Sequence, residues 1–99
     1  MTKADLVKKI SKDTGILRKD VAIVVDAFLE SVQDTLEEGN HIEIRGFGTY
    51  KLKVRKARTG RNPKTNEEVP VPARVVPVFK FSPALKESVS ESNENLVKK

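Results

Sequence analysis

The chain has 99 residues, no cysteine, a formal net charge of +5 and a pI near 9.6. This composition describes one small domain without disulfides or thiolate metal sites, and no apolar run is long enough to span a membrane. The start, Met1–Asp5, does not have the pattern of a signal peptide, so we expect a soluble cytoplasmic protein. The basic balance favours nucleic acid as the partner, with an anionic membrane surface as the second possibility.

The chain opens with a predicted amphipathic helix. Thr2 can cap it, with Asp5 completing a variant of the capping box, and Gly15 is suited to end it in the left-handed conformation. The predicted inner face is formed by Leu6, Val7 and Ile10. Of the outward lysines, we expect only Lys3 to touch a ligand.

A longer second helix is predicted from Arg18 to Glu38. Its apolar residues recur at helical spacing and are Val21, Val24, Val25, Phe28, Leu29, Val32 and Leu36. Ala22, Ile23 and Ala27 widen this stripe until the first half is apolar nearly all round. One short helix cannot cover so much surface in so small a domain, which predicts a second copy of the chain. The alternative is a monomer whose sheet covers both sides of the helix.

A short alternating strand, Asn40–Arg45, is followed by Gly46-Phe47-Gly48. The glycines permit a sharp turn and place Phe47 in apolar surroundings, but no Lys-Ser/Thr pair follows, so this is not a nucleotide-binding loop. His41 is the only histidine and has no triad-like partners. Because the basic region also offers only Glu67 and Glu68 as acids, an enzyme acting on nucleic acid is not predicted.

The basic residues concentrate between Lys51 and Lys80, where nine cations and two acids give a local net charge of +7 and leave −2 for the rest of the chain. Tyr50–Arg55 alternates apolar and basic residues as a half-buried strand does. Turn residues follow over Thr59–Asn66, and a second β-rich segment, Val69–Phe81, leads the chain back. The pattern predicts a long β-hairpin arm, approximately residues 55–74, that projects roughly 30 Å with Pro63 near its end. An unstructured basic loop is the alternative.

The return strand contains Pro70, Pro72 and Pro77, which lack a backbone donor and therefore mark a sheet edge. Phe79 and Phe81 alternate with Lys80, and Ser82-Pro83 is suited to begin a last helix. We expect the domain to comprise residues 1–89 and residues 90–99 to form a polar, disordered tail.

The sequence from about Thr2 to Val89 resembles the bacterial histone-like HU/IHF family. The segments that carry the resemblance are Gly46–Tyr50, Ala57–Thr65, Ala73, Val76–Pro77 and Phe79–Lys80. The resemblance implies an α+β intertwined dimer with a helical base, an antiparallel β saddle and two long β-ribbon arms. HU and IHF are themselves examples of minor-groove architectural binding, so the resemblance also implies arms in the minor groove, intercalation of the tip proline and bending of the duplex.

Transferred to this chain, the resemblance implies a nucleoid-associated protein that bends or compacts DNA without strong sequence specificity. Its partners would be double-stranded DNA and a second copy or a paralogue, with no membrane, cofactor, metal or catalytic residue. Pro63 would intercalate. The predicted DNA-binding residues are Lys3, Arg45, Lys53, Arg55, Arg58, Arg61, Asn62, Pro63, Lys64, Thr65, Arg74, Lys80 and Lys86. The predicted dimer core contains Phe28, Leu29, Val32, Phe47 and Phe79.

Several residues depart from the family pattern. Leu17 replaces a helix-capping Ser or Thr, Asn66 replaces a turn glycine, and Arg45 stands where a small or neutral residue is common. Phe81-Ser82-Pro83 replaces Pro-Gly-Lys and removes a phosphate-contacting lysine. Site-specific bending of the IHF type stays open, as does RNA binding, although the grooves of an A-form duplex suit such arms poorly.

Overall fold

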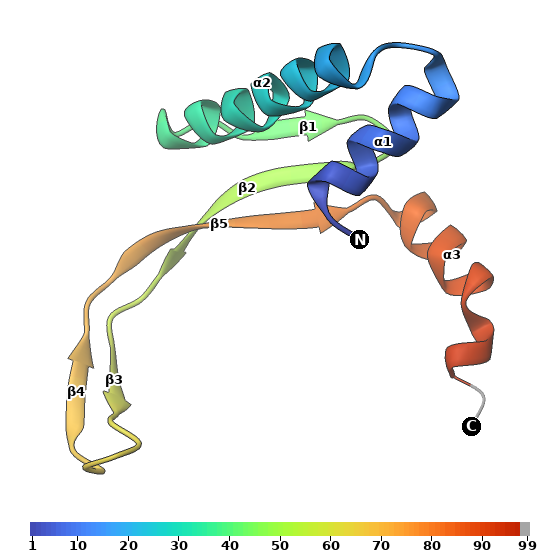
Figure 1. Ribbon diagram of the computed structural model, residues 1–99. Coiled ribbons are helices and arrows are strands. Elements are labelled where there is room, and N and C mark those ends of the chain that lie inside the picture. The colour runs from blue at the N-terminus through green and yellow to red at the C-terminus, as the bar shows by residue number, and fades with distance from the viewer. Residues whose placement is uncertain (98–99) are drawn as a thin grey trace. The chain divides into compact units, whose positions relative to one another are not determined.

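The computed structural model describes residues 1–97, which divide into a helical unit, Met1–Glu38, and a β-rich unit that begins at Gly39 (Figure 1). The helical unit contains α1, Lys3–Thr14, and α2, Arg18–Glu37. The β-rich unit contains strands β1 to β5 and a closing helix, α3.

The ends of α1 follow from its capping residues, as the sequence predicts. The Thr2 hydroxyl accepts a hydrogen bond from the Asp5 amide, and the Asp5 carboxylate accepts one from the Thr2 amide. Gly15 ends α1 in the left-handed region with φ 78°. Leu17 occupies the N-cap of α2 and makes no side-chain capping bond. On α1, the Lys9 ammonium donates to Asp13 over 2.8 Å, and this hydrogen bond raises the pKa of Lys9.

The apolar core of the single chain is very small. Among residues 1–97, the buried hydrophobic side chains are Val7, 8% exposed, and Val21, 4% exposed. No large side chain in that range is completely buried. The broad apolar stripe of α2 therefore stays largely uncovered within one chain, as the prediction of a second copy requires.

Two sheets make up the β-rich unit. The first has three antiparallel strands in the order β1–β2–β5. The second is a two-stranded ribbon, β3 with β4, that continues beyond β2 and β5 (Figure 1). The bounds are Ile42–Ile44 for β1, Gly48–Arg55 for β2, Arg58–Arg61 for β3, Glu68–Val71 for β4 and Arg74–Phe81 for β5.

The two sheets belong to one hairpin with a single register. Arg55 is opposite Arg74 at the end of the first sheet, and three residues further along each strand Arg58 is opposite Val71. No residue is inserted, so the predicted hairpin is confirmed. The ladder is interrupted at residues 56–57 and 72–73, however, and Pro72 stands in this gap. Proline cannot donate to a ladder, but Pro70 and Pro77 stand within paired strands, so Pro72 by itself does not explain the break. The prolines of β4 and β5 lie in edge strands, as predicted.

Four aromatic rings gather at the end of β2 and β5. Phe79 lies 4.5 Å from Tyr50, 4.7 Å from Phe81 and 5.5 Å from Phe47, measured between ring centroids. Phe47 therefore has the predicted apolar neighbours, although 44% of it stays exposed in the single chain. The turn that positions it depends on Gly46, whose φ is 81°.

Helix α3, Pro83–Ser92, is attached to this turn through Ser82. The Ser82 amide donates to the Phe47 carbonyl over 2.9 Å, its hydroxyl donates to the Gly46 carbonyl over 3.1 Å, and the same hydroxyl caps α3. The helix continues three residues beyond the domain end expected at residue 89, and a 3-10 turn over Glu94–Leu96 follows. Lys98 and Lys99, the end of the expected tail, lie outside the described residues.

Gly48 should be indispensable for packing this aromatic cluster. A Cβ at this buried position would lie 2.4 Å from the Phe79 ring and 2.5 Å from the Lys80 carbonyl oxygen, so backbone would have to move. We expect Gly48→Ala to lower the free energy of unfolding by about 1–3 kcal/mol, measured by chemical unfolding at fixed protein concentration. Gly60→Ala, whose nearest contact would be 3.3 Å to a Val71 methyl, is the milder control. Equal midpoints for Gly48→Ala and the unmodified chain would contradict this packing.

Candidate nucleic-acid interface

One face of the three-stranded sheet carries the cations of its strands, among Val76, Val78 and Glu43, and the other face is apolar. Side chains alternate along a strand, and residues directly opposite each other in antiparallel strands share a face. Lys51, Lys53 and Arg55 of β2 therefore share a face with Lys80 and Arg74 of β5. All five are exposed. The other face carries Tyr50, Leu52, Phe79 and Phe81.

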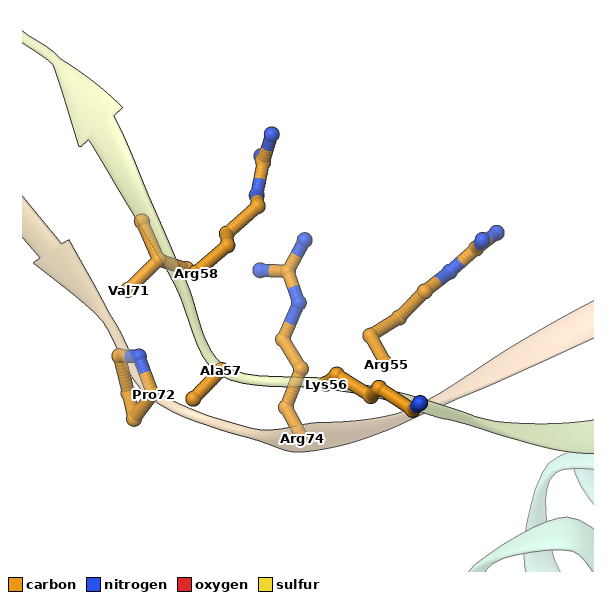
Figure 2. A pocket seen from close by; sticks show the side chains of 7 residues that line it. All are labelled: Arg55, Lys56, Ala57, Arg58, Val71, Pro72 and Arg74. Carbon is orange, nitrogen blue, oxygen red and sulfur yellow. The ribbon is translucent and has the colours of Figure 1, made fainter.

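The gap in the ladder allows cations from both sides of it to gather. In a regular ribbon, Arg55 and Arg58 would point to opposite faces because they are three residues apart. Figure 2 shows instead that Arg55, Arg58 and Arg74 extend to the same side, with Ala57 and Pro72 on the other. These residues, together with Lys56 and Val71, line an open hollow of about 550 Å³. None of the described residues that line it is an acid, and its four cations suit a polyanion.

The tip of the arm is a four-residue loop closed by Asn62 and Glu67. The Asn62 amide donates to the Glu67 carbonyl over 2.9 Å, and the Asn66 amide donates to the Asn62 carbonyl over 2.7 Å. The Asn62 side-chain oxygen accepts the Lys64 amide over 2.9 Å, and the Thr65 hydroxyl oxygen accepts the Glu67 amide over 3.4 Å. Asn62 and Thr65 thus shape the loop, which leaves Pro63 exposed within it.

The remaining predicted contact residues lie outside the arm. Lys3 belongs to the helical unit, where its ammonium pairs with Asp26 over 2.7 Å, so a phosphate contact would have to exchange for this ion pair. Arg45 is exposed in the turn that follows β1. Lys86 lies on α3, beside the apolar groove formed with Phe47.

Two cations of this surface are absent from the residues predicted as contacts. Lys51 shares the cationic face with Lys53, and Lys56 lines the hollow at the ladder gap. The alternation of Tyr50–Arg55 already indicates the position of Lys51. Nothing in the sequence indicates that of Lys56, because it depends on where the ladder is interrupted.

Other kinds of site are not supported by the described chain. Within residues 1–97, no group of three or more His, Cys, Asp or Glu side chains is placed to hold a metal ion. None of the helices in that range combines the length and apolar character needed to cross a membrane.

Comparison with known proteins identifies the class. Residues 1–90 match the family described as "Bacterial DNA-binding protein", and the chain belongs to this family. The family is one of DNA-binding proteins and not of enzymes, as the sequence predicts.

Among its relatives, DNA-binding protein HU of Thermus thermophilus is 44% identical, with 92% of this chain and 94% of the relative covered. Integration host factor subunit beta of Marinobacter nauticus is 48% identical, with coverage of 93% and 95%. In structure, the chain is similar to Anabaena HU from a cocrystal with DNA, with a TM-score of 0.86 and 36% identity over 91% of this chain and 98% of that one. The predicted HU/IHF family and its α+β fold are confirmed.

The cationic hollow generates a prediction about salt. Arg58→Ala should reduce the slope of log K for DNA binding against log salt concentration by about 0.9, because one phosphate contact is lost. It should weaken binding to random and A·T-rich duplexes by similar factors. Lys9→Ala removes the same charge from α1, where Lys9 is paired with Asp13, and serves as the control. If Arg58→Ala leaves the slope of a titration series unchanged, the interface lies elsewhere.

Proposed function

We propose that this protein is an architectural, nucleoid-associated DNA-binding protein. It pairs with a second copy of itself or a paralogue, inserts two arms into the minor groove and bends the duplex with Pro63. The observation that carries this proposal is the arm itself: one register leads from the cationic face of the sheet, through the arginine-lined hollow, to a loop that exposes a proline.

The side chains of the arm favour the minor groove. That groove is narrow and strongly negative, and it attracts arginine. Arginines lie along the outgoing strand and at the start of β5, whereas the middle of the return strand, Val69–Pro72, has no side-chain donor or acceptor to read base edges. The major groove, whose base edges identify every base pair, would leave this apolar stretch without a role.

The same composition supports binding without strong sequence specificity. Affinity would come from phosphate contacts and from the ease with which a sequence deforms. The relatives include both an HU and an integration host factor subunit, so site-specific bending is the second candidate. The weak base-reading capacity of the return strand favours the general mode.

Bending would follow from placing a rigid apolar ring between two base pairs. In minor-groove architectural proteins, of which HU and IHF are examples, unstacking costs a few kcal/mol per base step. The cations of the sheet, Lys51, Lys53 and Lys80, would offset that cost by binding the duplex as it bends toward them. Pro63 thus supplies the kink, and the cationic face supplies the favourable contacts.

A second chain is required by the uncovered apolar surface. Phe28 is 50% exposed, Leu29 48% and Phe81 48%, and an open apolar groove of about 460 Å³ lies between Phe47 and α3. Val32 and Phe79, also predicted for the dimer core, are half-buried. A soluble monomer rarely leaves so many large apolar side chains in water, whereas a second copy would cover them.

The proposal therefore predicts an obligate dimer. We expect sedimentation to give twice the chain mass at micromolar concentration, and the midpoint of thermal unfolding to rise with protein concentration because dissociation and unfolding are linked. A folded monomer at micromolar concentration, with a midpoint independent of concentration, would exclude the dimer.

The proposal also predicts that bending and binding can be separated at Pro63. Pro63→Ala keeps every cation and shortens the wedge, so it should lose much of the bend angle on straight duplex, measured by end-to-end energy transfer. Binding to a nicked duplex should weaken less than binding to a straight one, because the nick already reduces the unstacking cost. Pro70→Ala removes the same side chain from β4, away from the tip, and is the matched control. Equal losses on straight and nicked DNA would mean that Pro63 only shapes the turn.

A further inference from the structure

Arg61 is the one arm arginine whose guanidinium is held by neighbours within the arm's described residues. It lies in β3, where Nη1 donates to the Asn66 side-chain oxygen over 3.2 Å. Its Nη2 lies 4.0 Å from the Glu68 carboxylate on the opposite strand. The hydrogen bond to Asn66 holds the guanidinium beside the loop that carries Pro63.

Asn66 is an unusual residue for its backbone conformation. Its φ is 59°, in the left-handed region, where glycine is favoured and asparagine is tolerated. Its amide donates to the Asn62 carbonyl, a main-chain bond that glycine would also make. Its side-chain oxygen accepts the hydrogen bond from Arg61. The turn could therefore form with glycine at this position, whereas the hydrogen bond to Arg61 requires the asparagine side chain.

We propose that Asn66 is a positioning residue for Arg61, which it orients toward the DNA before binding occurs. This inference rests on the proposed function. Immobilising a long arginine side chain costs conformational entropy, and part of that cost is already met in the free protein. A neutral acceptor occupies only one of the five guanidinium donors and leaves the positive charge intact for phosphates or groove edges.

The Glu68 carboxylate contacts the same guanidinium, but its effect on DNA binding is opposite to that of Asn66. Its contact with Arg61 is a longer ion pair between two exposed side chains, 62% and 72% accessible, and such pairs contribute little. When the arm enters a negative groove, this carboxylate is repelled and competes with the DNA for Arg61. Asn66 therefore assists binding, and Glu68 opposes it.

The test is a double-mutant cycle on a short straight duplex, with Asn66→Gly and Arg61→Ala made singly and together. Asn66→Gly keeps the left-handed turn and removes the acceptor. We expect it to weaken binding roughly two- to tenfold, the range of one hydrogen bond, with an unchanged salt slope because no cation is lost. In the Arg61→Ala background it should have no effect. Glu68→Gln should tighten binding and steepen the slope.

A measurement without DNA supports the same assignment. In the free protein, Asn66→Gly should increase the mobility of the Arg61 Nε–H group in NMR relaxation, while the amide signals of Lys64 and Glu67 stay in place because the loop is intact. An equal loss of affinity in both backgrounds, or unaltered Arg61 mobility, would overturn the positioning role. If neither Arg61→Ala nor Arg58→Ala weakens binding, the proposed arm interface itself fails.

Discussion

The rest of this structure depends on the register between β2 and β5. Residues that face each other across an antiparallel ladder share a side, so this one alignment places Lys53 with Lys80 on one face and Tyr50 with Phe79 on the other. A slip by one residue would exchange the two faces of a strand and place charges among the aromatic rings. The close approach of Phe79 to Gly48 opposes such a slip. The core and the cationic surface are therefore two consequences of the same pairing.

The separation of faces leaves the chain with little core of its own. A small domain buries a smaller fraction of its surface than a large one, and this one also devotes about a fifth of its residues to an arm that buries almost nothing. The apolar faces of the sheet and of α2 thus remain available for a second chain. Under the proposed function, stability and DNA binding are coupled, since pairing through these faces is what would supply two arms to one duplex.

The arm combines a weak point with an ordered end. An isolated two-stranded ribbon is marginally stable in water, and the ladder gap at Pro72 removes pairing where the arm leaves the sheet. At the tip, in contrast, the backbone amides of Lys64, Asn66 and Glu67 all have acceptors, and Arg61 is held in place. Under the proposed function, this combination would suit a duplex whose path changes on binding, because the stem would follow the bend while the tip presents one geometry.

The sequence by itself determined the features that arise from neighbouring residues. The ends of α1 follow from Thr2 and Gly15, and the alternation of β2 and the turn around Pro63 follow from local side-chain chemistry. Only the tertiary structure decided that Arg55 and Arg58 share a side, since this depends on where the pairing of two distant strands is interrupted. The hydrogen bond of the Ser82 hydroxyl to Gly46, 36 residues earlier, is also non-local. Helix capping and side-chain periodicity depend on residues close together in the sequence. The contacts of Arg58 and Ser82, in contrast, form only after distant segments have paired.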